Sequence, residues 1–169
     1  MLRTVGGHIE PGPGARPVGS TGTGQRVTHV TVRPWWDPGL AVSGFDPRSV
    51  YVERFWLGVL GPSTVLLLRR FARGLEEHPN GFRVSLSDTA QAIGLGRGDG
   101  RQAPISRTID RACDFGLARR DAVDTLSIRT HLPRLTPRQL SRLPEVVRST
   151  HDHYLLHHAP DHPSGPQAA

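Results

Sequence analysis

The chain has 169 residues and a formal net charge of +6, and all 21 of its basic residues are arginine. This length fits one domain with tails better than two domains, and no stretch approaches the ~20 apolar residues of a membrane span. The charge is concentrated in residues 47–148, where 17 arginines face 10 acidic residues, and such a basic segment suits an anionic partner.

The start of the chain lacks the apolar stretch of a secretory signal, so we expect a cytoplasmic protein without a membrane partner. Its single cysteine, Cys113, excludes an internal disulfide and a cysteine-based zinc site. We expect Cys113 to be a buried structural thiol, because the neighbouring Asp110 and Asp114 oppose a reactive thiolate.

Glycine and proline are concentrated toward the two ends. Residues 1–46 hold nine Gly and five Pro, a composition that cannot offset the entropy of ordering. The resulting division is a disordered tail at 1–24, a partly extended segment at 25–46, a folded domain at 47–157 and a second disordered tail at 158–169.

Within the extended segment, the β-branched run from Gln25 to Arg33 favours an edge strand. The adjacent Trp35 and Trp36 are costly to expose, so they should pack onto the core. Asp46-Pro47 then has the pattern of a helix start, with Asp as N-cap and Pro at the first helical position.

That first helix is apolar nearly all round over residues 50–60, which predicts burial of most of it. Gly61-Pro62 interrupts the run and starts a second helix to about His78. Further helices are expected after Thr136-Pro137 and Leu143-Pro144.

The most informative stretch runs from Phe82 to Thr130. Ser85, three residues before Asp88, approximates a capping box, and Gly116 is a C-terminal helix signal. The predicted elements are a strand at 82–84, a helix at 85–94, a helix at 104–115 and a hairpin of strands 117–120 and 125–130.

This order resembles the winged helix-turn-helix family, and strings such as Asp46-Pro47-Arg48-Ser49 and Leu60-Gly61-Pro62-Ser63-Thr64 resemble uncharacterised winged-helix proteins of GC-rich bacteria. The resemblance implies an α+β, mostly α fold: a winged helix-turn-helix with flanking N- and C-terminal helices. It also implies a transcriptional regulator that places the 104–115 helix in the major groove of double-stranded DNA.

On a helical wheel, Ser106, Arg107, Asp110 and Arg111 face outward and are the expected base contacts. Arginines around this helix and on the hairpin are the expected phosphate contacts. These are Arg83, Arg97, Arg101, Arg119, Arg120 and Arg129.

Two alternatives stay open. The same outward arc, with Asp114 added, also describes an ordinary salt-bridged solvated face. In addition, the nine residues of 95–103 exceed the three or four of a typical helix-turn-helix connection.

The chain could therefore be a winged-helix protein-interaction module, in which Trp35, Trp36 and the 50–60 helix meet another protein or a second copy. A homodimer would use the flanking helices. DNA binding requires Arg107, Arg111, Arg119, Arg120 and Arg129 on one face, whereas a module would expose an apolar patch.

No cofactor, metal or catalytic site is expected. The glycines of 94–100 lack the Gly-Lys-Ser/Thr ending of a P-loop. His153 and His157 have a spacing that can hold a metal, but two such residues rarely complete a site. The chain shows no Ser/His/Asp order and no paired carboxylates, so we expect no enzyme.

Overall fold

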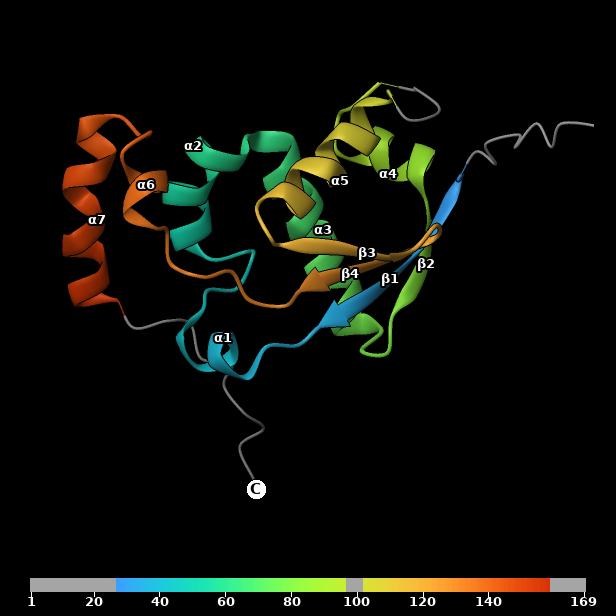
Figure 1. Ribbon diagram of the computed structural model, residues 1–169, viewed down its shortest axis with the longest axis horizontal. Coiled ribbons are helices and arrows are strands. Elements are labelled where there is room, and N and C mark those ends of the chain that lie inside the picture. Colours follow the sequence, from blue (N-terminus) through green and yellow to red (C-terminus); the bar gives the residue numbers. More distant parts are fainter. Residues whose placement is uncertain (1–26, 97–101, 159–169) are drawn as a thin grey trace, which may run out of the picture.

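Figure 1 shows a computed structural model of the chain, which describes residues 27–96 and 102–158. The elements are β1 (His29–Trp35), α1 (Pro38–Ser43), the π-helix η1 (Val52–Trp56), α2 (Leu57–Leu60), α3 (Pro62–Glu77), β2 (Phe82–Ser85), α4 (Leu86–Ala92), α5 (Pro104–Asp114), β3 (Ala118–Ala122), β4 (Thr125–Arg129), α6 (Pro137–Leu140) and α7 (Glu145–His157). The expected α+β class, with more helix than strand, is confirmed.

The strands form one sheet in the order β2-β1-β4-β3. β1 runs antiparallel to β2 and parallel to β4, and β3 and β4 form the expected hairpin. The prediction of an edge strand near residue 30 is therefore wrong, because β1 has a neighbour on each side. Its buried Val30 and Val32 explain why the strand lies inside the sheet.

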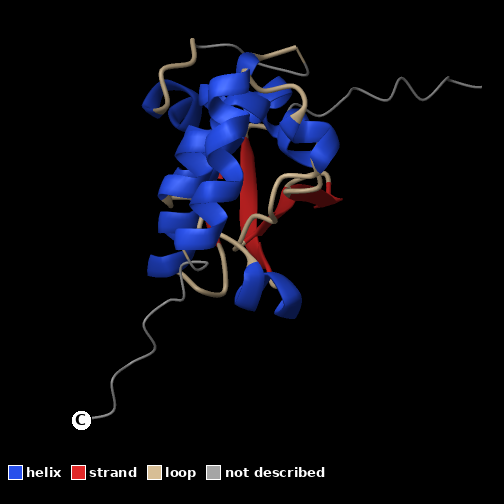
Figure 2. Cartoon of the chain, turned by 90° about the vertical axis from the view of Figure 1, so that its left-hand side faces the viewer, coloured by secondary structure: helices blue, strands red, loops and turns tan. Residues whose placement is uncertain are grey.

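One face of the sheet carries the core. Val32, Leu126 and Ile128 share this face and are at most 1% exposed, and α3 and α5 pack beside them. In Figure 1, α3 lies behind the sheet, and in Figure 2 the strands form a thin layer next to a larger mass of helices.

The opposite face presents polar side chains, because alternate residues of a strand point to opposite sides. We call it the open sheet face. It comprises His29, Thr31, Arg33 and Trp35 of β1, Arg83 and Ser85 of β2, Arg119 and Asp121 of β3, and Thr125, Ser127 and Arg129 of β4.

The first long helix begins later than predicted. Asp46 accepts a hydrogen bond from the backbone N–H of Arg48 at 2.6 Å and also binds its guanidinium at 2.8 Å. This contact closes a turn, so helical structure begins only at residue 50 and passes through η1. Arg48 also reaches Glu76 at 2.5 Å, which ties the turn to α3.

Most apolar side chains of the 50–60 helix are buried inside the chain, as predicted, whereas Val50 and Leu57 are 52% and 37% exposed. Tyr51 and Phe55 are at most 1% exposed, and both rings pack against His151 and Tyr154 of α7. The indole Nε1 of Trp56 donates to the carbonyl of Pro133 at 3.0 Å. The buried side of this helix therefore belongs to the core, and of its apolar side chains only Val50 and Leu57 are left for contact with another protein.

The helix ends around the middle of the chain follow the sequence signals. The Ser85 hydroxyl accepts from the backbone N–H of Asp88 at 3.2 Å, which caps α4. Gly116 has a φ of 67° just after α5, a conformation that strongly favours glycine. Thr136 and Gln139 form a full capping box at α6.

Candidate nucleic-acid interface

Helix α5 is positioned by its inner face. Ile105, Ile109 and Ala112 are 1–2% exposed, and the helix packs against α3, α4 and β3. Pro104 stands at its first position, where the missing N–H costs nothing. The outer side consists of the half-buried Ser106 and the exposed Arg107, Asp110, Arg111 and Asp114.

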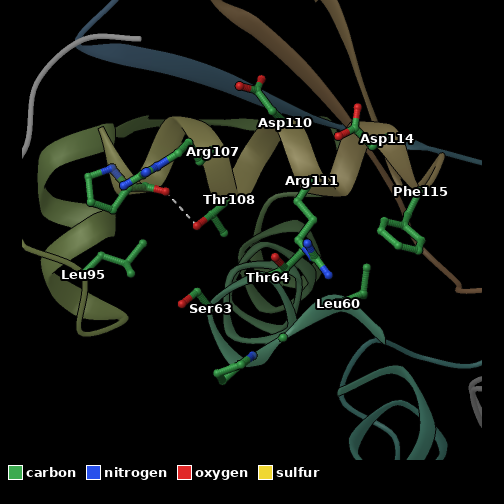
Figure 3. Close-up of a pocket in the computed structure, with 13 residues that line it drawn as sticks. Leu60, Ser63, Thr64, Leu95, Arg107, Thr108, Asp110, Arg111, Asp114 and Phe115 are labelled. Carbon is green, nitrogen blue, oxygen red and sulfur yellow. Dashed lines mark hydrogen bonds between the residues drawn. The ribbon is translucent and has the colours of Figure 1, made fainter. Parts of the chain in front are cut away.

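A surface pocket of about 660 Å³ runs between this outer side and the start of α3. Residues 61–64 form one wall, and Arg107, Thr108 and Arg111 form much of the other. Figure 3 shows Arg111 directed toward this wall, whereas the carboxylates of Asp110 and Asp114, which also line the pocket, point away from it. The outer side of α5 is therefore accessible along this flank.

Arg111 does not point freely outward as the helical wheel predicts. Its Nη2 donates to the backbone carbonyl of Val59 at 2.7 Å, and its guanidinium lies 5.5 Å from the ring of Phe115. The carbonyl belongs to the last turn of α2, so Arg111 joins two helices of the protein. A base contact would require it to leave this position.

Asp110 and Arg120, which both belong to the predicted DNA surface, neutralise each other. The Nη2 of Arg120 lies 2.8 Å from Oδ1 of Asp110. This pair links the hairpin to α5, and about half of each side chain is exposed. Arg107, in contrast, forms no ion pair within the described residues.

Arg119 and Arg129 lie on the open sheet face, away from α5. Their guanidinium carbons lie 4.7 Å and 3.9 Å from the ring centre of Trp35. Arg119 pairs with Asp121 at 2.9 Å, and Arg129 pairs with Asp37 at 2.6 Å. Hydrogen bonds from Arg129 hold the pKa of Asp37 below its ordinary value.

Arg83 shares the open sheet face, opposite Thr31 in the β1–β2 register. Sequence reasoning missed Arg33 on the same face. The apolar Val30 and Val32 alternate with Thr31 and Arg33, a strand pattern that could have indicated its position. Arg97 and Arg101, the remaining expected phosphate contacts, lie outside the described residues.

The requirement that five arginines share one face is not met. Arg107, Arg111 and Arg120 lie on the α5 side of the sheet, and Arg119 and Arg129 lie on the other. The correction follows from strand alternation: neighbouring residues of β3 must point to opposite faces. One flat DNA surface cannot use the whole predicted set.

The remaining candidate residues are the histidines of α7 and Cys113. The rings of His153 and His157 lie 4.1 Å apart, whereas His151 turns inward. Within residues 27–96 and 102–158, no three His, Cys, Asp or Glu side chains gather as metal ligands. Burial raises the pKa of the half-buried Cys113 thiol, which favours the uncharged form.

In the described part of the chain, every helix is too short or too polar to cross a membrane. Comparison of the sequence with protein-family models and with curated proteins, and of the fold with solved structures, gives no match.

Proposed function

We propose that the chain is a winged-helix protein that binds double-stranded DNA and regulates transcription, with α5 in the major groove. The observation that carries this proposal is the arrangement around α5. Helices α4 and α5 pack together, the β3–β4 hairpin follows at once, and the outer side of α5 is exposed. This order is the one that winged-helix proteins use to present a helix to a duplex.

Arg107 is the proposed base contact, with Ser106 beside it. Arg107 is exposed, lies in the N-terminal half of α5 and has no acidic partner within the described residues. Recognition helices contact base edges mainly with their N-terminal residues, and arginine binds guanine through two hydrogen bonds. Arg111 and Arg120 support the surface indirectly, through Val59 and Asp110.

Fluorescence anisotropy with random and genomic duplexes at two salt concentrations tests this function. Arg107→Ala should cost ~1–3 kcal/mol at the preferred site and weaken the preference at one base pair. The matched control is Arg142→Ala, which removes an exposed arginine beyond the hairpin, between α6 and α7. Undetectable duplex binding at low salt, where even non-specific binding appears, would remove the proposal.

A protein-interaction module is the second candidate, favoured by one specific observation. Trp36, just before α1, is 61% exposed, which corrects the expectation that it packs onto the core, and Val42 on α1 is 64% exposed. Large exposed apolar side chains close in sequence are typical of contact sites. If duplex binding fails, Trp36→Ser tests this candidate. A protein that co-purifies with the parent chain should then no longer co-purify with the variant.

A further inference from the structure

We propose that the open sheet face is a second nucleic-acid surface, which binds the phosphate backbone of a single strand. It lies across the sheet from α5 and is independent of the duplex proposal.

The first pair is Arg33 and Arg83. Arg83 lies opposite Thr31 in the β1–β2 register, so Arg33, two residues along β1, is its diagonal neighbour on the same face. Both side chains are exposed, and neither forms an ion pair within the described residues. Two adjacent like charges repel, and a phosphate bound between them would remove that repulsion.

The second pair is Arg119 and Arg129, which are held by the half-buried ring of Trp35. Arg129 also donates to the carbonyl of Gly116 at 2.8 Å. These contacts fix both guanidinium groups in place, so little side-chain entropy is lost when they meet a ligand.

Three acids lie on or next to the open sheet face. Asp37 and Asp121 are each bonded to an arginine, and Asp124 lies 3.3 Å from the Thr125 hydroxyl. The arginines of this face without an acidic partner in the described part of the chain are therefore Arg33 and Arg83, and the four arginines and three acids together carry a net charge of +1. A ligand should bind there first and extend toward Trp35.

The chain itself has no evident anionic segment to cover this face. Residues 1–26 contain one acid, Glu10, and residues 159–169 contain one, Asp161. An external polyanion is the occupant that fits the charge. A sheet face with arginines and hydroxyl groups is also the kind of surface on which single strands lie, and the Trp35 ring positions two of these arginines.

The test uses the full chain and fluorescein-labelled oligo(dT) and oligo(rU), each measured by anisotropy at two salt concentrations. Arg33→Ala/Arg83→Ala should weaken binding of both strands about tenfold at low salt and flatten the slope of log K against log salt by about 1.4, the value for two phosphate contacts on a single strand. The control double variant, Arg138→Ala/Arg142→Ala, removes the same charge outside the sheet and should leave affinity near that of the parent.

Arg33→Gln/Arg83→Gln gives the same comparison with longer side chains, and thermal melting verifies that each variant folds. The proposal is overturned if the parent chain does not bind either strand at low salt, or if the sheet-face variants lose no more affinity than the control. The duplex proposal fails separately: Arg107→Ala affects only duplex binding, and loss of duplex binding alone leaves the single-strand result intact.

Discussion

The hydroxyl of Tyr51 lies 3.0 Å from Nε2 of His151, a residue 100 positions later in the chain. The same hydroxyl accepts a hydrogen bond from the backbone N–H of Leu135 at 2.9 Å. The hydroxyl can therefore donate its own proton to Nε2 of His151. This arrangement fits the tautomer of His151 that carries its proton on Nδ1, which lies 3.3 Å from Oδ1 of Asp152. One buried phenol thus joins the 50–60 helix, the segment before α6, and α7.

Tyr51→Phe should destabilise the fold because it leaves two buried groups without a partner. Each buried, unsatisfied polar group costs ~1–3 kcal/mol, and the stacking of this ring on Phe45 at 3.7 Å would persist. Urea denaturation measures the change. The control is His153→Asn on the exposed side of α7, and equal stability of the two variants would mean that the hydroxyl contributes nothing.

Because of Tyr51, the free energy of unfolding should also decrease at high pH. Burial raises its pKa from 10.0 to about 12. The unfolded chain releases the phenolic proton near the lower value and the folded chain only near the upper one, so stability is complete below pH ~10 and is lost as pH rises toward ~12.

Denaturation midpoints of the parent chain and Tyr51→Phe across this pH range isolate the effect, since both retain Tyr154. The parent should lose more stability than the variant between pH ~10 and ~12. Parallel curves would contradict the assignment.

A third prediction concerns where the folded chain begins. A chain that starts at Val27 should fold, because the residues removed lie before β1. A chain that starts at Pro38 should not, since it loses the buried Val30 and Val32 and the strand between β2 and β4. Each valine contributes ~1.5–3 kcal/mol by burial, against a total stability of ~5–15 kcal/mol.

Circular dichroism and limited proteolysis of the two chains measure this difference. We expect the protease-resistant fragment to begin before His29 and not between β1 and Asp46. A folded chain from Pro38 onward would show that β1 is dispensable despite its position inside the sheet.

Local signals in the sequence were sufficient to predict the helices and the hairpin around α5. Ser85, Pro104 and Gly116 act within one turn of their own helix, so their effect can be derived without knowing the rest of the fold. The place of β1 could not be derived in this way. It depends on pairing with β2 and β4, which lie far along the chain.

The same distinction applies to the candidate site. A helical wheel correctly placed Arg107 and Asp114 on the outer side of α5. It could not show that Arg111 binds the carbonyl of Val59, 52 residues away. Nor could it show that Arg119 and Arg129 lie beyond the sheet, because that depends on β-strand alternation and register.

The two acids on the outer side of α5 should differ in their effect on duplex binding. Asp114 is exposed and forms no ion pair within the described residues, whereas Asp110 is paired with Arg120. If α5 meets a duplex, the carboxylate of Asp114 repels the phosphates. Asp114→Asn should therefore tighten duplex binding about two- to fivefold at low salt, and the gain should shrink at high salt because exposed charges are screened.

Anisotropy at two salt concentrations measures this gain, with Glu145→Gln on α7 as the control for the same change of net charge. The control should tighten binding less, because Glu145 lies on another helix outside the proposed contact. Asp110→Asn provides an independent comparison, since it releases Arg120 as well as removing a negative charge. Equal affinities for Asp114→Asn and Glu145→Gln would place the duplex away from α5, even if the protein binds DNA.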